Sequence, residues 1–183
     1  NKDAPYCQIV IDPKIKTLQD LAGKKIGVEN GDPNYIENIQ FITLLKKLDV
    51  DTSTITFVGR DFADPIATDL QAGLTDADAG LFATNDLVTA QMRGVDVNTI
   101  YYSDYGIDFY ANVIVAAGPF LKENPDLVER FMRATLRGYQ YALEHPDEAV
   151  AATLKYDEKL DGTIQAAQMT AQIPLIDTGD QPI

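Results

Sequence analysis

Acidic side chains collect in four short segments of this sequence, each of which follows a run of mostly apolar residues. The segments are residues 30–35, 59–64, 83–86 and 103–110, and their aspartates are Asp32, Asp61, Asp64, Asp86, Asp104 and Asp108. Arg60 is their only cation. Carboxylates accept hydrogen bonds from N–H groups and repel anions. A site built from these segments therefore favours a neutral nitrogen heterocycle or a cation over a sulfonate, nitrate or phosphate.

Aromatic residues accompany these carboxylates. Four of the nine tyrosines and one phenylalanine lie within ten residues: Tyr101, Tyr102, Tyr105, Phe109 and Tyr110. Tyr35, Phe62 and Phe82 lie beside the other segments. Proteins hold flat ligands by ring stacking, while a few polar groups fix the orientation. The predicted ligand-binding residues are Asn30, Tyr35, Phe62, Asn85, Asp86, Asp104, Tyr105 and Tyr110.

Several of these residues also have a structural explanation. Asp32 and Asp64 precede predicted helices, and helix capping explains them better than ligand contact does. Asn85 can cap a helix, contact a ligand, or do both. Neighbouring residues of a strand point to opposite faces, so at least one of Tyr101 and Tyr102 is expected in the core.

Composition excludes several classes of function. Fifteen basic against 28 acidic residues give the 183-residue chain a net charge of −13, which argues against binding to nucleic acid or to an anionic membrane. The single Cys7 excludes an intrachain disulfide and a cysteine-based zinc cluster, and the single His145 excludes the usual multi-histidine metal sites. We predict no metal, no cofactor and no catalytic residues, so the chain is expected not to be an enzyme.

The elements that would position the four segments alternate along the chain. Predicted strands cover residues 25–29, 54–58, 79–83 and 98–102, and predicted helices cover residues 32–47, 64–73 and 85–94. This alternation is typical of parallel βαβ units. Ligands of such sheets bind at the carboxyl ends of the strands, which is where the four segments fall.

The character of the sequence changes after Asp104. One β-rich run, residues 109–116, precedes three predicted helices: a long one between Asn124 and His145, then 147–156 and 161–176. A single strand cannot form a sheet that covers their apolar faces. This region is therefore expected to be half of a domain, whose missing strands lie upstream of Asn1 or come from another chain.

Three segments resemble a known family. Residues 18–28, 70–78 and above all 123–149 resemble ABC-transporter solute-binding proteins of the taurine/nitrate/thiamin-pyrimidine-precursor (NMT1-like) family. Residues 104–110 lean toward its pyrimidine-precursor and riboflavin binders. Together these likenesses extend over residues 15–177.

The resemblance implies an α/β fold of the periplasmic-binding-protein-like (type II) class, a two-lobe clamp with parallel-rich sheets flanked by helices. Residues 1–19 would be an incoming hinge, 20–103 a complete second lobe, and 104–183 the return hinge and helical part of an incomplete first lobe. Asn85-Asp86 stands where pyrimidine-binding relatives carry an Asn/Glu pair.

The implied function is the capture of a small aromatic heterocycle, of pyrimidine, thiamin-precursor or flavin type, and its delivery to an ABC permease. The expected protein is a monomer in the periplasm or outside the cell, with an export signal or lipid anchor upstream. An alternative is a thiamin-pyrimidine-synthase-like enzyme, which needs iron, a cysteine-rich motif and a cleft histidine. Another is a ligand-sensing domain of the same fold, which flanking DNA-binding or signalling sequence would reveal.

Overall fold

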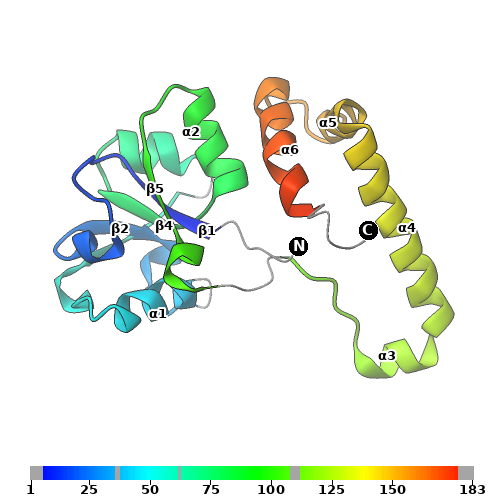
Figure 1. Ribbon diagram of the computed structural model, residues 1–183, viewed down its shortest axis with the longest axis horizontal. Helices are drawn as coiled ribbons and strands as arrows, with labels where there is room; N and C mark the ends of the chain where they lie inside the picture. Colours follow the sequence, from blue (N-terminus) through cyan, green and yellow to red (C-terminus); the bar gives the residue numbers. More distant parts are fainter. Residues whose placement is uncertain (1–5, 36–37, 62, 108–111, 177–183) are drawn as a thin grey trace. The chain divides into compact units, whose positions relative to one another are not determined.

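The computed structural model describes residues 6–35, 38–61, 63–107 and 112–176 (Figure 1). The chain divides into two compact units. The sheet unit is Ala4–Phe109, and the helical unit is Tyr110–Ile183 together with Asn1–Asp3. No helix in the described parts of the chain is long and apolar enough to span a membrane.

The sheet unit is built on five strands in the order β3-β2-β4-β1-β5. Their bounds are β1 (Tyr6–Val10), β2 (Lys25–Val28), β3 (Thr56–Gly59), β4 (Ala77–Phe82) and β5 (Asn98–Tyr101). β2 pairs in parallel with β3 and β4, whereas β1 is antiparallel to both β4 and β5. Strands β2 to β5 therefore all run in one direction, and their carboxyl ends share one edge with the start of β1. We call this the carboxyl edge.

The four predicted strands are confirmed as β2 to β5, with bounds shifted by one or two residues. The sequence prediction missed β1. Its central residue, Gln8, is fully buried between apolar neighbours, so β1 lacks the alternation of apolar and polar residues that marks a half-exposed strand. Because β1 runs against the other four, the sheet is mixed and not wholly parallel.

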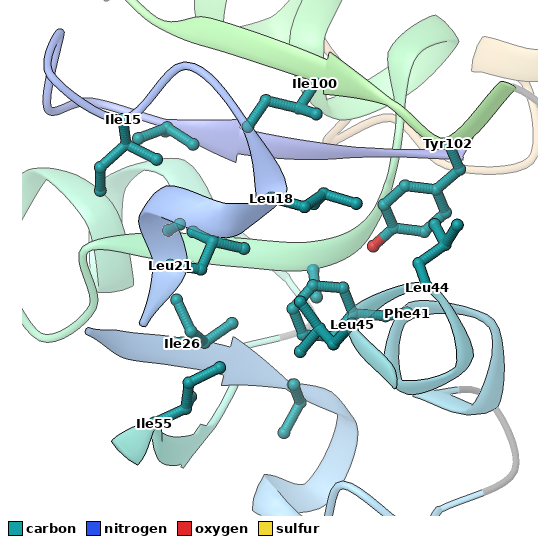
Figure 2. Packing of buried hydrophobic residues seen from close by; sticks show 14 residues of the cluster. Ile15, Leu18, Leu21, Ile26, Phe41, Leu44, Leu45, Ile55, Ile100 and Tyr102 are labelled. Atoms are coloured by element: carbon teal, nitrogen blue, oxygen red, sulfur yellow. The ribbon is translucent and has the colours of Figure 1, made fainter. Parts of the chain in front are cut away.

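Helical segments cover both faces of the sheet (Figure 1). On one face, Ile26 and Val28 of β2 pack against η1 (Leu18–Leu21) and α1 (Ile39–Lys47). Figure 2 shows side chains of this cluster, including Leu18, Phe41 and Tyr102. On the other face a second cluster packs β1 and β4 against η5 (Ile66–Gln71), η6 (Ala83–Leu87) and α2 (Val88–Met92). Burying each large apolar side chain contributes about 1.5–3 kcal/mol, so both layers hold the sheet in place.

The helical unit contains α3 (Gly118–Glu123), α4 (Pro125–Glu144), α5 (Pro146–Leu154) and α6 (Gly162–Ile176). The three long helices agree with the predicted ones. His145 ends α4 and precedes the first residue of α5, as expected from the His145-Pro146 pair. The Asp161 carboxylate accepts hydrogen bonds from the amides of Thr163 and Ile164 at 2.8 and 3.1 Å, which caps the start of α6.

The predicted β-rich run is wrong over its described part. Residues 112–117 have no regular secondary structure, and residues 109–111 lie outside the described residues. The described part of the helical unit holds no strand with which this run could pair, and an unpaired strand leaves its backbone groups without partners. Instead, residues 114–117 line an apolar groove of about 560 Å³ with Phe120, Leu127 and Phe131.

A close approach in the middle of the sheet depends on a glycine. Gly27 of β2 lies beside Asp78 of β4, a residue with no exposed surface. A Cβ at position 27 would stand 2.0 Å from Asp78 Oδ1. Only the absence of a side chain at Gly27 leaves room for this carboxyl group.

We therefore expect Gly27→Ala to destabilise the protein by about 1–3 kcal/mol in urea unfolding, since overpacking forces neighbours to move. The loss should shrink in an Asp78→Ala background, where the clashing carboxyl is gone. Gly138→Ala is the control, because open space surrounds this helical glycine. Equal losses for Gly27→Ala with and without Asp78 would contradict this account.

Candidate functional site

The carboxyl edge brings together the segments that follow four strands. Residues 29–35 follow β2, 60–64 follow β3, 83–86 follow β4 and 102–105 follow β5. Since β2 to β5 run in one direction, all four segments lie at the same edge, as the sequence predicted. Two predicted site residues, Phe62 and Tyr110, lie outside the described residues.

The segment after β2 is held by a buried asparagine that sequence reasoning missed. Asn38 accepts a hydrogen bond from the Glu29 amide at 3.1 Å and donates to the carbonyls of Glu29 and Asp32 at 3.0 and 2.7 Å. Within this loop Asn30 is exposed and adopts a left-handed backbone with φ of 55°. Tyr35 is also exposed at the surface. The loop thus presents both predicted residues on a fixed backbone.

The capping predictions have opposite outcomes. Asp32 does not cap a helix: its carboxylate accepts from the Asn34 amide two residues on, at 2.9 Å, and α1 begins only at Ile39. The Asp32 carboxylate accepts a hydrogen bond within its own turn, and such local hydrogen bonds compete with helix capping. Asp64 does cap, because it accepts from the Ala67 amide at 3.2 Å. It also accepts two hydrogen bonds of 2.7 Å from Arg93.

Arg60, the cation of the four segments, is engaged inside the sheet unit. Its guanidinium donates from Nη2 to Glu29 Oε2 at 3.0 Å and from Nη1 to the Ala79 carbonyl at 3.1 Å. Both charged side chains are nearly buried, with 11% and 7% of their surface exposed. The pair joins the residues that directly follow β2 and β3 to the backbone of β4, and it neutralises the positive charge. An anionic ligand would have to compete with Glu29 for this guanidinium.

The segment after β4 carries the Asn85-Asp86 pair. Asn85 is exposed, whereas Asp86 is partly buried and accepts a hydrogen bond from the Phe82 amide at 2.8 Å. Burial raises the pKa of the Asp86 carboxyl, and the Phe82 amide and Arg60 oppose that rise. Asn85 is thus the member of the pair that the loop displays, while Asp86 fastens the loop to the end of β4.

The tyrosines at and after the end of β5 differ in burial. Tyr102 is buried, and its hydroxyl accepts from the Gly80 amide at 3.0 Å, while Tyr101 is 37% exposed. The expectation that at least one of these two belongs to the core is confirmed. Tyr105 is held structurally, since its hydroxyl accepts from the Leu18 amide at 3.3 Å and its ring packs on the core. Asp104 is exposed.

A second aromatic feature of the carboxyl edge was not predicted. Tyr6, the first residue of β1, faces Phe82, the last of β4, with 4.6 Å between ring centroids. Tyr6 escaped notice because β1 itself was missed. The aromatic and β-branched residues in 6–10 were the available signal.

Asp78 is a buried carboxyl that sequence reasoning also missed. It has no exposed surface, and no hydrogen bond of ordinary geometry reaches its oxygens from the described residues. Burial raises its pKa from 3.8 to about 7. Thr75 and Arg60 oppose the rise, whereas the carboxylates of Asp69 and Asp86 add to it. No group of three potential ligands that could hold a metal ion occurs among the described residues.

The raised pKa of Asp78 makes stability depend on pH. Below pH 4 the carboxyl is protonated in both the folded and the unfolded chain. Between pH 4 and 7 the unfolded chain loses the proton and the folded chain keeps it, so the free energy of unfolding falls as pH rises, by about 1.4 kcal/mol per pH unit at most. Above the folded pKa of about 7 this contribution is constant.

Asp78→Asn should remove this slope. The neutral amide carries no charge to bury, so the variant should be more stable than the wild type at pH 8, by about 2–4 kcal/mol. Urea unfolding at pH 4, 6 and 8 measures the difference. Asp96→Asn, at an exposed aspartate of the same unit, is the control. Parallel pH profiles for the wild type and Asp78→Asn would contradict the assignment.

A mixed sheet flanked by helices on both faces, with loops gathered at its carboxyl edge, is the α/β architecture of periplasmic binding proteins. The periplasmic aliphatic sulphonate binding protein SsuA from Escherichia coli matches with a TM-score of 0.69 and 19% identity, over 91% of this chain and 51% of its own. SsuA from Xanthomonas axonopodis pv. citri, bound to MOPS, matches with a TM-score of 0.62 and 14% identity, over 92% and 55%. Identities this low show the fold alone.

The sequence identifies the family more closely. The model of the family described as NMT1/THI5 like matches residues 4–149, and the chain belongs to this family. The riboflavin-binding protein RibY of Chloroflexus aurantiacus is 36% identical over 75 residues, or 41% of this chain and 21% of its own. The formylaminopyrimidine-binding protein of Halalkalibacterium halodurans is 25% identical over 124 residues, or 67% and 38%. The chain thus spans well under two thirds of these relatives.

Proposed function

We propose that this chain is part of a solute-binding protein that captures a small aromatic heterocycle at the carboxyl edge and delivers it to an ABC permease. The observation that supports this proposal most directly is the ion pair between Arg60 and Glu29, which is nearly buried. At the same edge Asn30, Asn85 and Asp104 are exposed. Such an edge offers amide groups and carboxylates to a ligand's N–H groups and ring nitrogens, and its cation is already neutralised.

The relatives support a ligand of this class. Two matching proteins are named for binding riboflavin and formylaminopyrimidine, and both ligands are flat, nitrogen-rich rings. The structural neighbours are named for sulfonates, which are anions. The engaged guanidinium of Arg60 favours the first class for this chain. We therefore propose a pyrimidine, a thiamin precursor or a flavin as the ligand.

The proposal also assigns the parts of the chain. Residues 20–103 would be one lobe, with 1–19 as the segment that leads into it, and 104–183 would return to the other lobe. The apolar groove lined by 114–117, Phe120, Leu127 and Phe131 would then be covered by further residues of that lobe. The protein would act as a monomer in the periplasm or outside the cell. An export signal would direct it there, or a lipid anchor would hold it at the membrane.

The single cysteine favours binding over catalysis. Cys7 is fully buried, its thiol donates to the Leu81 carbonyl at 3.5 Å, and burial raises its pKa, so it is a poor source of thiolate. A ligand at the carboxyl edge could not reach this thiol as it would reach a catalytic nucleophile, because Cys7 has no exposed surface.

Calorimetric titration of the full chain tests the proposal. Riboflavin or a formylaminopyrimidine should bind, and ethanesulfonate should bind more weakly by a factor of ten or more, which is about 1.4 kcal/mol. Asn85→Ala should weaken heterocycle binding about tenfold, because it removes a displayed amide. Gln71→Ala is the matched control, since this exposed amide ends η5 and precedes β4, at the opposite edge.

Preferential binding of ethanesulfonate would contradict the proposed ligand class. Equal effects of Asn85→Ala and Gln71→Ala would contradict the proposed position of the site.

A further inference from the structure

Two aromatic rings contact each other at the carboxyl edge and are only partly buried. Tyr6 and Phe82 are direct partners in the antiparallel ladder between β1 and β4. Their ring centroids are 4.6 Å apart and the ring planes are inclined by 39°. Both side chains are only partly buried, although Tyr6 packs on one side against the core cluster that includes Phe41 and Tyr102. The Tyr6 ring is therefore held by the core, and both rings remain partly exposed to solvent.

Two polar residues, Asn85 and Asp86, follow Phe82 closely in the chain. The Phe82 amide donates to Asp86 Oδ2 at 2.8 Å, so the carboxylate lies beside the backbone that carries the Phe82 ring. Asn85 is the neighbouring residue and is exposed. An apolar aromatic surface thus borders a carboxylate and an amide, all at the end of one strand. Sites for flat heterocycles combine these elements.

A third aromatic residue, Tyr101, lies at the same edge and serves as a comparison for Tyr6. Tyr101 ends β5 at the same edge and is 37% exposed. It pairs with Cys7 across the ladder, so the two side chains share a face of the sheet. Tyr6 precedes Cys7 in β1 and points to the other face. Tyr101 is therefore a control tyrosine at the same edge of the sheet, on the face opposite to the Tyr6–Phe82 pair.

We propose that Tyr6 and Phe82 form the stacking platform of the binding site, on which a flat heterocycle lies with its polar rim at the carboxyl edge, where the loop of Asn85 and Asp86 begins. The inference rests on the proposed function and adds the residues that determine ligand class. The ring pair selects planar ligands, because stacking requires a π face. Asn85 and Asp86 then select among planar ligands those with N–H donors at the rim.

Riboflavin is a suitable probe, since a tyrosine ring stacked on the flavin quenches its fluorescence. Bound riboflavin should be strongly quenched in the wild type. Tyr6→Leu and Phe82→Leu keep apolar volume without a ring, and each should weaken binding about tenfold. Tyr6→Phe should bind like the wild type and restore much of the fluorescence of the bound flavin. Tyr101→Leu should change neither affinity nor quenching.

The outcomes separate this inference from the proposed function. If the wild type binds riboflavin or a formylaminopyrimidine and both leucine variants bind equally well, the platform is overturned and the proposed function stands. If the wild type binds neither compound, both are overturned. Should a leucine variant fail to fold, nuclear Overhauser contacts between bound riboflavin and the rings of Tyr6 and Phe82 decide in the wild type. Their presence supports the platform, and contacts to other aromatic rings only would overturn it.

Discussion

The nearly buried ion pair between Arg60 and Glu29 is the interaction on which the carboxyl edge depends. One guanidinium, directly after β3, bonds the carboxylate of Glu29, directly after β2, and the Ala79 carbonyl within β4. A buried charge without its partner is strongly destabilising, so the three strands are held together as a unit. The pair also sets the chemistry of the edge, because it removes the positive charge that an anion would need.

The loops at this edge are preorganised by short-range contacts. Asn38 holds the loop after β2 through three hydrogen bonds, and a Cβ on Gly31 would lie only 3.0 Å from the Gly59 amide at the end of β3. Asp86 fixes the loop after β4 to the last residue of that strand. Groups held in this way lose little further freedom when a ligand binds, which favours affinity.

The amino-acid pattern predicted four strands and the edge they share, because alternation of strands and helices dictates where parallel strands end. It did not predict β1, since a fully buried strand around Gln8 shows no alternation, and Tyr6 was lost with it. The run 109–116 has strand-like residues, yet over 112–117 it finds no partner strand. The burial of Asp78 against Gly27 depends on packing between strands that are far apart in sequence, which no local pattern reveals.

The central claim is that a heterocycle binds at the carboxyl edge of the sheet. Amide chemical shifts recorded during titration with riboflavin or a formylaminopyrimidine test it most directly. The account predicts changes concentrated in residues 30–35, 60–64, 82–86 and 102–105, together with Tyr6 at the start of β1. Changes concentrated at the opposite edge, in residues 17–24, 72–76 and 94–98, or in the apolar groove of the helical unit, would contradict it.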